Sequence, residues 1–225
     1  MANDVLNTGA GASASPSPRK KPGRPSGAHG EQAREQLLDI ALALFARQGI
    51  GETTLGAIAR EAGVTPAMVH YYFKTRDQLL DMLIDERFVP LRVELARVFN
   101  DPDSEPVDTL RAFVETLVAT VDKYPWFAAL WVREMISDGG LLRQRMAERF
   151  GDTHKDRGIE RIAGWQKEGK LNPSLEPSLV FASLFGLTVF PLATSRWRGE
   201  GNRTVSAEQL ARHVVALLMN GIQPY

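Results

Sequence analysis

The segment that decides the fold is residues 53–80, TTLGAIAREAGVTPAMVHYYFKTRDQLL. Its apolar residues recur at helical spacing, and a glycine, Gly63, interrupts the pattern. Thr54 is a suitable N-cap for a first short helix, and Thr65 for a second helix that has Pro66 at its first position. Two short helices joined by a turn that contains glycine predict a helix-turn-helix.

The second of these helices has an unusual outward face. A helical wheel places Val69 and Phe73 toward the core. The opposite face is small, aromatic and basic, and it consists of Ala67, His70, Tyr71 and Lys74, with Met68 and Tyr72 on its flank. A helix that enters the major groove of DNA needs such a face, so we predict a recognition helix. The alternative is that these aromatic residues pack on the next domain.

The same segment resembles the DNA-binding part of tetracycline-repressor (TetR) type transcriptional regulators. The resemblance covers roughly residues 31–84, and its most specific parts are Thr53-Thr54, Ile58-Ala59, Ala62-Gly63-Val64, Tyr72-Phe73-Lys74 and Asp77 to Leu80. It implies an all-α chain with an N-terminal three-helix helix-turn-helix domain and a C-terminal helical domain for ligand binding and dimerisation. It also implies a homodimer that binds a double-stranded DNA operator.

The resemblance assigns roles to individual residues. Thr54 would contact a phosphate from the start of the first short helix. Residues Thr65, Pro66, Ala67 and His70 would lie at the base edges, and Tyr71, Tyr72 and Lys74 would contact the DNA backbone. Pro66 and Met68 stand where the family often has a polar or basic side chain, which leaves this helix fewer groups for direct readout.

The N-terminal arm is basic. Residues 19–27, RKKPGRPSG, carry four positive charges and no acid. Their Gly-Arg-Pro core resembles an AT-hook, in which Arg24 would enter a narrow minor groove. The alternative is a solvated tail that only adds attraction to phosphates. We expect residues 1–30 to be a disordered arm, 31–76 the DNA-binding domain and 77–225 the effector-binding and dimerisation domain.

The remaining sequence is also patterned as helices. A helix that begins after Thr75 extends to about Val98, and Pro90 should kink it. Punctuation by glycine and proline predicts five further helices, at residues 104–123, 125–138, 141–168, 176–194 and 205–220.

The second domain is rich in aromatic and soft side chains. Most of them are expected to form its core, but some can line a cavity for a hydrophobic or aromatic small-molecule effector. The candidate ligand-binding residues are Phe113, Trp131, Met135, His154, Trp165 and Phe185. Arg133 and Glu134 are a further polar pair, which can bind a ligand or simply each other.

The helices at 176–194 and 205–220 are the candidates for the dimer interface. The first is apolar almost all round, so one face has to meet its own domain and another a partner. The candidate interface residues are Leu184, Leu187, Leu210, Val214 and Leu217. Residues 177–195 lack any charge, but Pro191 and several hydroxyl side chains argue against a membrane span.

The composition excludes several other classes. Lys plus Arg and Asp plus Glu number 27 each, and there is no cysteine, so disulfides and thiolate metal sites are excluded. The N-terminus lacks the pattern of a signal peptide, and we expect a cytoplasmic protein. No sequence motif of an enzyme, metal site or cofactor site is present, so we expect no cofactor. A helical carrier of hydrophobic small molecules is the alternative function.

Overall fold

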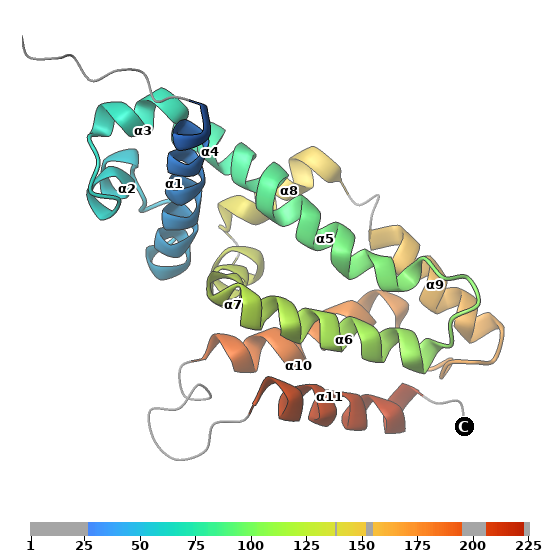
Figure 1. The fold of residues 1–225 in the computed structure, drawn as a ribbon. Coiled ribbons are helices and arrows are strands. Elements are labelled where there is room, and N and C mark those ends of the chain that lie inside the picture. Colours follow the sequence, from blue (N-terminus) through green and yellow to red (C-terminus); the bar gives the residue numbers. More distant parts are fainter. Residues whose placement is uncertain (1–26, 138, 152–154, 195–205, 223–225) are drawn as a thin grey trace, which may run out of the picture.

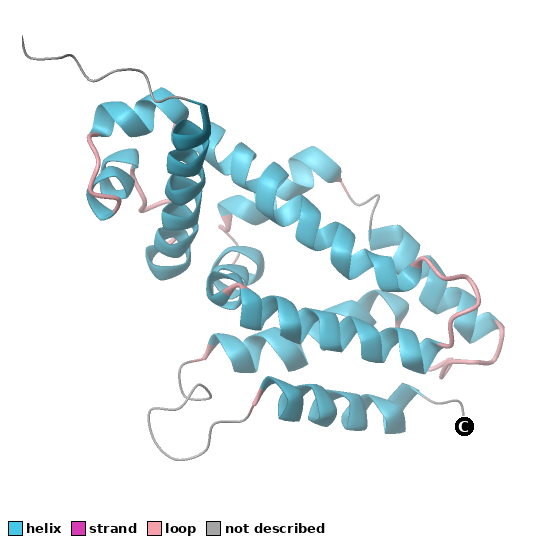
Figure 2. Cartoon of the chain, in the orientation of Figure 1, coloured by secondary structure: helices cyan, strands magenta, loops and turns pink. Residues whose placement is uncertain are grey.

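The computed structural model describes residues 27–137, 139–151, 155–194 and 206–222, and all regular structure in these segments is helical (Figures 1 and 2). The predicted all-α fold is confirmed. The α-helices are α1 (Gly27–Gln48), α2 (Leu55–Glu61), α3 (Pro66–Tyr72), α4 (Arg76–Leu83), α5 (Val89–Ala96), α6 (Pro106–Lys123), α7 (Pro125–Trp131), α8 (Leu141–Phe150), α9 (Lys155–Lys167), α10 (Pro177–Ala193) and α11 (Ala207–Ile222). Two π-helical turns, η1 (Ile84–Phe88) and η3 (Val132–Ile136), and one 3-10 turn, η2 (Arg97–Phe99), extend α4, α7 and α5.

The helix-turn-helix has the predicted boundaries because its caps are satisfied locally. The Thr54 hydroxyl accepts a hydrogen bond from the Ala57 N–H at 3.1 Å, and the Thr65 hydroxyl accepts one from the Met68 N–H at 3.3 Å. Between the helices Gly63 has a φ of +67°, a left-handed conformation that suits glycine and ends α2. Each short helix is therefore fixed at its N-terminus by its own threonine.

A first group of buried side chains, here called the N-terminal cluster, holds α1 to α4 together. It is built from the inward faces of all four helices and includes Leu38, Phe45, Ile58, Val69, Phe73 and Leu83. Leu130 of α7 and Leu142 of α8 belong to the same cluster, although they come from the second half of the chain. Helix α1 packs on α7, so the N-terminal helices are held on the second half of the chain by this contact as well as through α4.

The long connection α4–η1–α5 departs from α-helical geometry where a kink was expected. The Val89 N–H donates to the carbonyl of Ile84, five residues back, immediately before Pro90. Proline has no N–H to donate, and a π-turn is one way for a helix to accommodate that loss. The disturbance at Pro90 is therefore a π-turn within a helix that otherwise continues to Ala96 (Figure 1).

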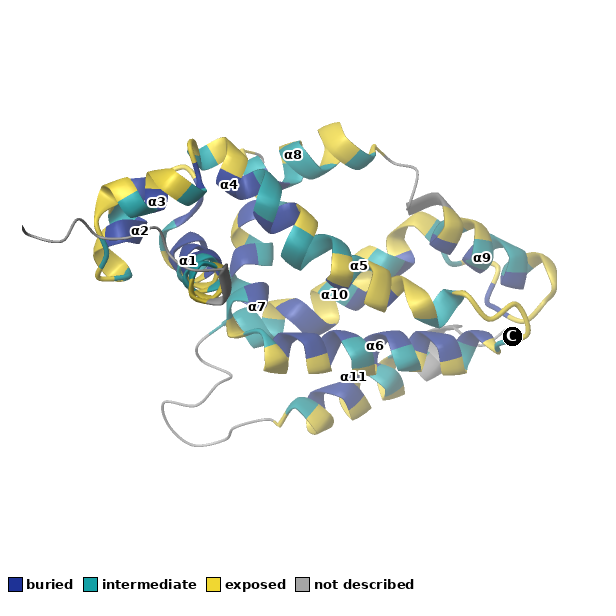
Figure 3. Cartoon of the chain, turned by 45° about the horizontal axis from the view of Figure 1, so that its top comes forward, coloured by how far each residue is buried: buried dark blue, intermediate teal, exposed yellow. Residues whose placement is uncertain are grey.

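A second group of buried side chains, the C-terminal cluster, joins α5, α6, α7, α9, α10 and α11. Figure 3 shows that buried residues line the inner faces of α6 and α11, which lie side by side. Helix α11 begins with a reciprocal cap, since the Ser206 hydroxyl accepts from the Gln209 N–H and the Gln209 side chain accepts from the Ser206 N–H.

Two predicted boundaries were wrong. The single helix expected at 141–168 is two helices, because Gly151 adopts a φ of +57° and a ψ of −153° that ends α8. Helix α1 begins at Gly27, within the segment 1–30 that we expected to be a disordered arm, since residues 27–30 contain no proline to stop a helix from extending. None of the described helices is long and apolar enough to span a bilayer.

Candidate functional site

The outward face of α3 has the composition expected of a recognition helix. Val69 and Phe73 are fully buried in the N-terminal cluster. On the opposite side the exposed residues are Ala67, His70, Tyr71 and Lys74, as Figure 3 indicates by the exposed colour along α3. Tyr71 keeps 59% of its surface exposed, which is a high value for a large aromatic side chain. The wheel derived from the sequence is confirmed: the residues of the outward face are exposed, and Tyr72 on its flank is partly buried against the N-terminal cluster.

Tyr72 lies on the flank of this face and supports it. Its ring meets that of Tyr71 edge to face, with the centroids 5.1 Å apart. The Tyr72 hydroxyl is buried and has no hydrogen-bond partner within the described residues. A buried hydroxyl without a partner is unfavourable, so this group is available to a ligand that can approach it.

The two capping threonines can also contact DNA. Thr54 and Thr65 are both exposed, and the oxygen of each hydroxyl already accepts a backbone N–H. A hydroxyl carries one proton that it can donate while its oxygen accepts. Each threonine can therefore cap its helix and donate to a phosphate oxygen at the same time.

Arg76, two residues after Lys74, is used within the chain rather than left for phosphates. Its guanidinium donates to the carbonyl of Gly51 at 2.6 Å and to that of Ile50 at 3.4 Å. It therefore stabilises the loop between α1 and α2. Lys74 is exposed and forms no ion pair in the described part of the chain, so its charge is free to meet a phosphate. Arg24 lies outside the described residues.

The predicted effector residues are only partly brought together. Phe113, Trp131, Trp165 and Phe185 all join the C-terminal cluster. The Phe113 ring lies 5.8 Å from that of Phe185, and the Trp131 ring stacks on Phe185 at 4.9 Å with the planes inclined by 10°. Two further rings join them: Phe99 lies 5.7 Å from Phe113, and Phe181 lies 5.3 Å from Phe99.

Trp165 is fully buried in this cluster, and its indole N–H has no partner within the described residues. An unpaired buried N–H among aromatic rings can donate to a polar group of a bound molecule. Phe99 was not singled out from the sequence. Its position at the end of a long helix gave no signal that it would fold back onto Phe113.

The other effector candidates lie elsewhere. Met135 packs against the N-terminal cluster, so the structure does not bring it together with Phe113. His154 lies outside the described residues. Arg133 and Glu134 do not pair with each other: Arg133 donates to the carbonyl of Arg47 at 3.3 Å, and Glu134 accepts from the Ile50 N–H at 3.1 Å.

The predicted dimer residues divide into two groups. Leu184, Leu210 and Val214 are buried in the chain's own C-terminal cluster, so they are not available to a partner. Leu187 of α10 and Leu217 of α11 are exposed, with 37% and 51% of their surface accessible. Leu179 and Phe190 of α10 are exposed as well. On a helix that is apolar almost all round, the sequence could not distinguish the two faces.

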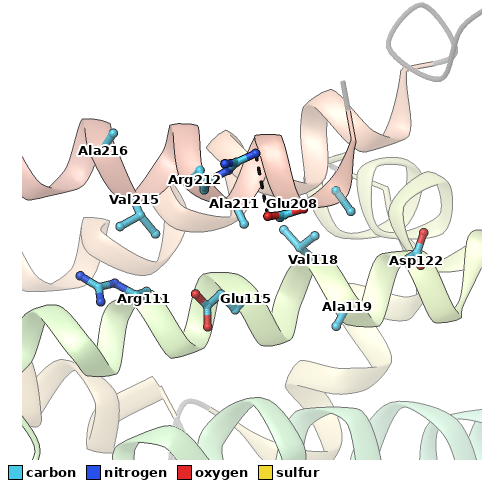
Figure 4. Close-up of a pocket in the computed structure, with 11 residues that line it drawn as sticks. Arg111, Glu115, Val118, Ala119, Asp122, Glu208, Ala211, Arg212, Val215 and Ala216 are labelled. Atoms are coloured by element: carbon cyan, nitrogen blue, oxygen red, sulfur yellow. Dashed lines mark ion pairs between the residues drawn. The ribbon is translucent and has the colours of Figure 1, made fainter. Parts of the chain in front are cut away.

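A groove of about 560 Å³ runs between α6 and α11 (Figure 4). Its floor is apolar and includes Val118, Ala211 and Val215, and its rim carries charges of both signs from Arg111, Glu115, Asp122, Glu208 and Arg212. None of the predicted effector residues lines it. The groove is thus separate from the aromatic rings described above.

A capped helix-turn-helix with an exposed, basic and aromatic α3 defines a DNA-binding protein, and comparison with known proteins gives the family. The profile of bacterial regulatory proteins of the tetR family matches residues 37–83, and that of the YcdC-like protein C-terminal region matches residues 89–225. The chain belongs to the tetR family and is a transcriptional regulator of the helix-turn-helix type. The resemblance seen in the sequence is confirmed.

Relatives and solved structures agree with this assignment. The chain is 28% identical over 201 residues to the regulator RutR of Escherichia coli (strain K12), which covers 85% of this chain and 91% of RutR. It is 28% identical over 130 residues to SrpR of Pseudomonas putida, which covers 56% of this chain and only 57% of SrpR.

Two solved structures show the same fold at lower identity. The ketosteroid regulator KstR2 of Mycobacterium tuberculosis has a TM-score of 0.64 at 22% identity, covering 84% of this chain and 94% of KstR2. AibR in complex with isovaleryl coenzyme A and operator DNA has a TM-score of 0.65 at 20% identity, covering 82% of this chain and 97% of AibR.

Proposed function

We propose that the chain is a homodimeric repressor that binds an operator through α3 and releases it when an apolar or aromatic small molecule binds among the rings of the C-terminal cluster. The observation that carries the DNA-binding part is the division of α3 into a buried face, Val69 and Phe73, and an exposed face around Tyr71. We further propose that the protein acts without catalysis and without a cofactor.

The contacts to DNA follow from the geometry of that face. Ala67 is small and lets the backbone of α3 approach the base edges, where His70 can donate or accept. Tyr71, Tyr72 and Lys74 would contact the DNA backbone, as would the donating hydroxyl of Thr54. Thr65 and Pro66 lie at the start of the helix and would approach the bases.

The basic arm adds to this interface in our proposal. Arg24 would enter a minor groove next to the site read by α3, or the four charges of residues 19–27 would attract phosphates without reading them. These two modes differ in their dependence on the flanking sequence. Replacing Arg24 with Lys keeps the charge and should weaken binding to A·T-flanked sites only if the groove is entered.

A second copy of the chain would cover the exposed apolar residues of α10 and α11. Leu179, Leu187 and Phe190 lie eight and three residues apart on α10, a spacing that puts them on one face. Leu217 adds an exposed apolar side chain from α11, which packs beside α10. Large exposed apolar residues of this kind mark contact surfaces.

The effector proposal rests on the aromatic rings and on the relatives. Within the C-terminal cluster, mutual ring contacts join Phe99, Phe113, Trp131, Trp165, Phe181 and Phe185. Two related structures are complexes with triclosan, in SmeT, and with isovaleryl coenzyme A, in AibR. A ligand releases DNA only if it binds the DNA-incompetent dimer more tightly than the competent one. We therefore expect a ligand that is at least partly apolar.

In vitro selection tests the proposal. The full-length protein is incubated with a random duplex pool at moderate salt, and the recovered sequences are compared with a scrambled duplex of equal composition. A regulator recovers a sequence with two related half-sites one helical turn apart, about 34–36 Å. A carrier of hydrophobic molecules recovers no sequence, and that result would contradict the proposal.

A further inference from the structure

Glu134 is a buried carboxylate at the boundary between the two halves of the chain. It belongs to η3, only 5% of its surface is exposed, and it accepts hydrogen bonds from two backbone N–H groups. One donor is Ile50, in the loop between α1 and α2, at 3.1 Å; the other is Leu142, at the start of α8, at 3.5 Å. Burying a carboxylate costs free energy, and hydrogen bonds from backbone N–H groups offset that cost only as long as they remain formed.

On the DNA side, Glu134 holds a loop that leads directly to the helix-turn-helix. Gly49 has a φ of +93°, and the Thr53 hydroxyl donates to its carbonyl at 2.7 Å. Arg76, at the start of α4, donates to the carbonyl of Gly51, two residues further along this loop. Thr54, the N-cap of α2, follows at once, so a displacement of Ile50 is passed to α2 and to the α3 that packs on it.

On the effector side, η3 follows directly after Trp131, whose ring stacks on Phe185 in the C-terminal cluster. Isolated π-turns are uncommon and occur frequently at functional sites. The chain also folds back tightly over this turn, since a β-carbon at Gly140 would lie 1.8 Å from the Glu134 carbonyl oxygen. Glu134 therefore sits one turn away from the rings and in direct contact with the loop.

We propose that Glu134 is a positioning residue for DNA binding: its hydrogen bond to Ile50 holds α2 and α3 in the arrangement that fits DNA. The inference rests on the proposed function and adds a route of regulation to it. A molecule that enters beside Trp131 shifts η3 and withdraws the carboxylate, which leaves the Ile50 N–H buried without a partner. The loop then relaxes, and the fit of α3 to the operator is lost.

The test uses full-length variants and the duplex selected by the wild-type protein. Glu134→Gln keeps the shape but offers one acceptor oxygen and an amide donor, so it cannot accept from both N–H groups. Glu134→Asp keeps the charge, but its side chain is one methylene too short to reach the Ile50 N–H. It replaces Glu134→Gln as the test variant if the glutamine variant does not fold. Glu115→Gln, an exposed change of the same type on α6, is the control.

Two quantities are measured at about 15 °C, where each variant retains its helical circular dichroism. They are the hydrogen exchange of the Ile50 amide and the ratio of affinities for the selected and scrambled duplexes. For Glu134→Gln we expect exchange to rise about tenfold or more, and the affinity ratio to fall about fivefold or more, while Glu115→Gln changes neither.

The outcomes separate this inference from the proposed function. If exchange of the Ile50 amide rises but the affinity ratio stays at the wild-type value, Glu134 stabilises the loop without affecting DNA binding, and the inference is overturned. If neither quantity changes, the hydrogen bond does not hold the loop and the inference is overturned as well. If the wild-type protein selects no duplex, the proposed function fails and the inference fails with it.

Discussion

The ring of Trp131 lies parallel to that of Phe185, with centroids 4.9 Å apart, and so joins the end of α7 to the middle of α10. This contact connects the helix that leads into η3 with the helix that carries the exposed leucines. A molecule that separates the two rings would act on both elements at once.

Replacing Trp131 with Ala should lower the free energy of unfolding by about 2 kcal/mol, less than for a fully buried tryptophan because Trp131 is half-buried. Trp131→Phe keeps a ring against Phe185 and should cost less. Urea unfolding measures both. Any compound from a hydrophobic library that raises the melting temperature of the wild-type protein should fail with Trp131→Ala; equal stabilisation of both proteins would place the effector elsewhere.

The junction of α1 with η1 should be sensitive to acid. The hydrogen bond from Arg34 holds the pKa of Glu86 below its usual value. The charged carboxylate therefore stabilises the fold above its unfolded pKa of about 4.3, and this contribution is lost as the pH falls through the lower folded pKa.

Glu86→Gln should accordingly lower the free energy of unfolding at pH 7 by about 1 kcal/mol or less, because the pair is partly solvated. Its difference from the wild-type protein should vanish in strong acid. Denaturant unfolding at a series of pH values measures this, with the exposed Glu115→Gln as a control. A difference that stays constant down to the lowest pH would show that the ion pair is not the cause.

The exposed and buried leucines of α10 should respond differently to a charge. Leu187→Glu, on the exposed face, should give a folded monomer, and so should Leu217→Glu on α11. Leu184→Glu buries a carboxylate in the C-terminal cluster and should unfold the chain rather than dissociate it. Sedimentation and circular dichroism separate these results. A dimer that persists in both exposed variants would exclude this face as the interface.

Two glycines on α9 provide a matched pair. A β-carbon at Gly164 would meet open space, so Gly164→Ala should stabilise the protein by about 0.5–1 kcal/mol through its better helix propensity. A β-carbon at Gly158 would lie 2.5 Å from the Phe181 ring, so Gly158→Ala should be destabilising despite the same gain. Thermal unfolding of the two variants tests the packing of α9 on α10.

The sequence predicted best those features that local chemistry controls. The caps at Thr54 and Thr65 and the division of α3 depend on residues within one turn of each other, and all are confirmed. The break at Gly151 was missed although the sequence carries a signal for it, since residues 151–158, GDTHKDRG, begin with a glycine and contain no large apolar side chain.

Contacts between distant segments could not be predicted. Glu134 was expected to bind a ligand or Arg133, but it accepts from the Ile50 N–H in the loop at residues 49–51. Arg76 binds the same loop at the Gly51 carbonyl, and both side chains come from elements that are distant along the chain. Leu184 is buried and Leu187 is exposed, although they lie only three residues apart on α10. The edge of the covered face depends on where α6 packs, and the uniform apolar composition of α10 does not encode it.

The measurement that tests the central claim most directly is the affinity of Tyr71→Ala for the selected duplex. Tyr71 is 59% exposed, so its loss should leave the fold intact, and we expect binding to weaken by about 1–3 kcal/mol. Lys74→Ala, measured alongside, should weaken binding to every duplex. It should also reduce the slope of the logarithm of the binding constant against the logarithm of the salt concentration by about one unit. Wild-type affinity in both variants, with unchanged salt dependence, would contradict the assignment of α3 as the recognition helix.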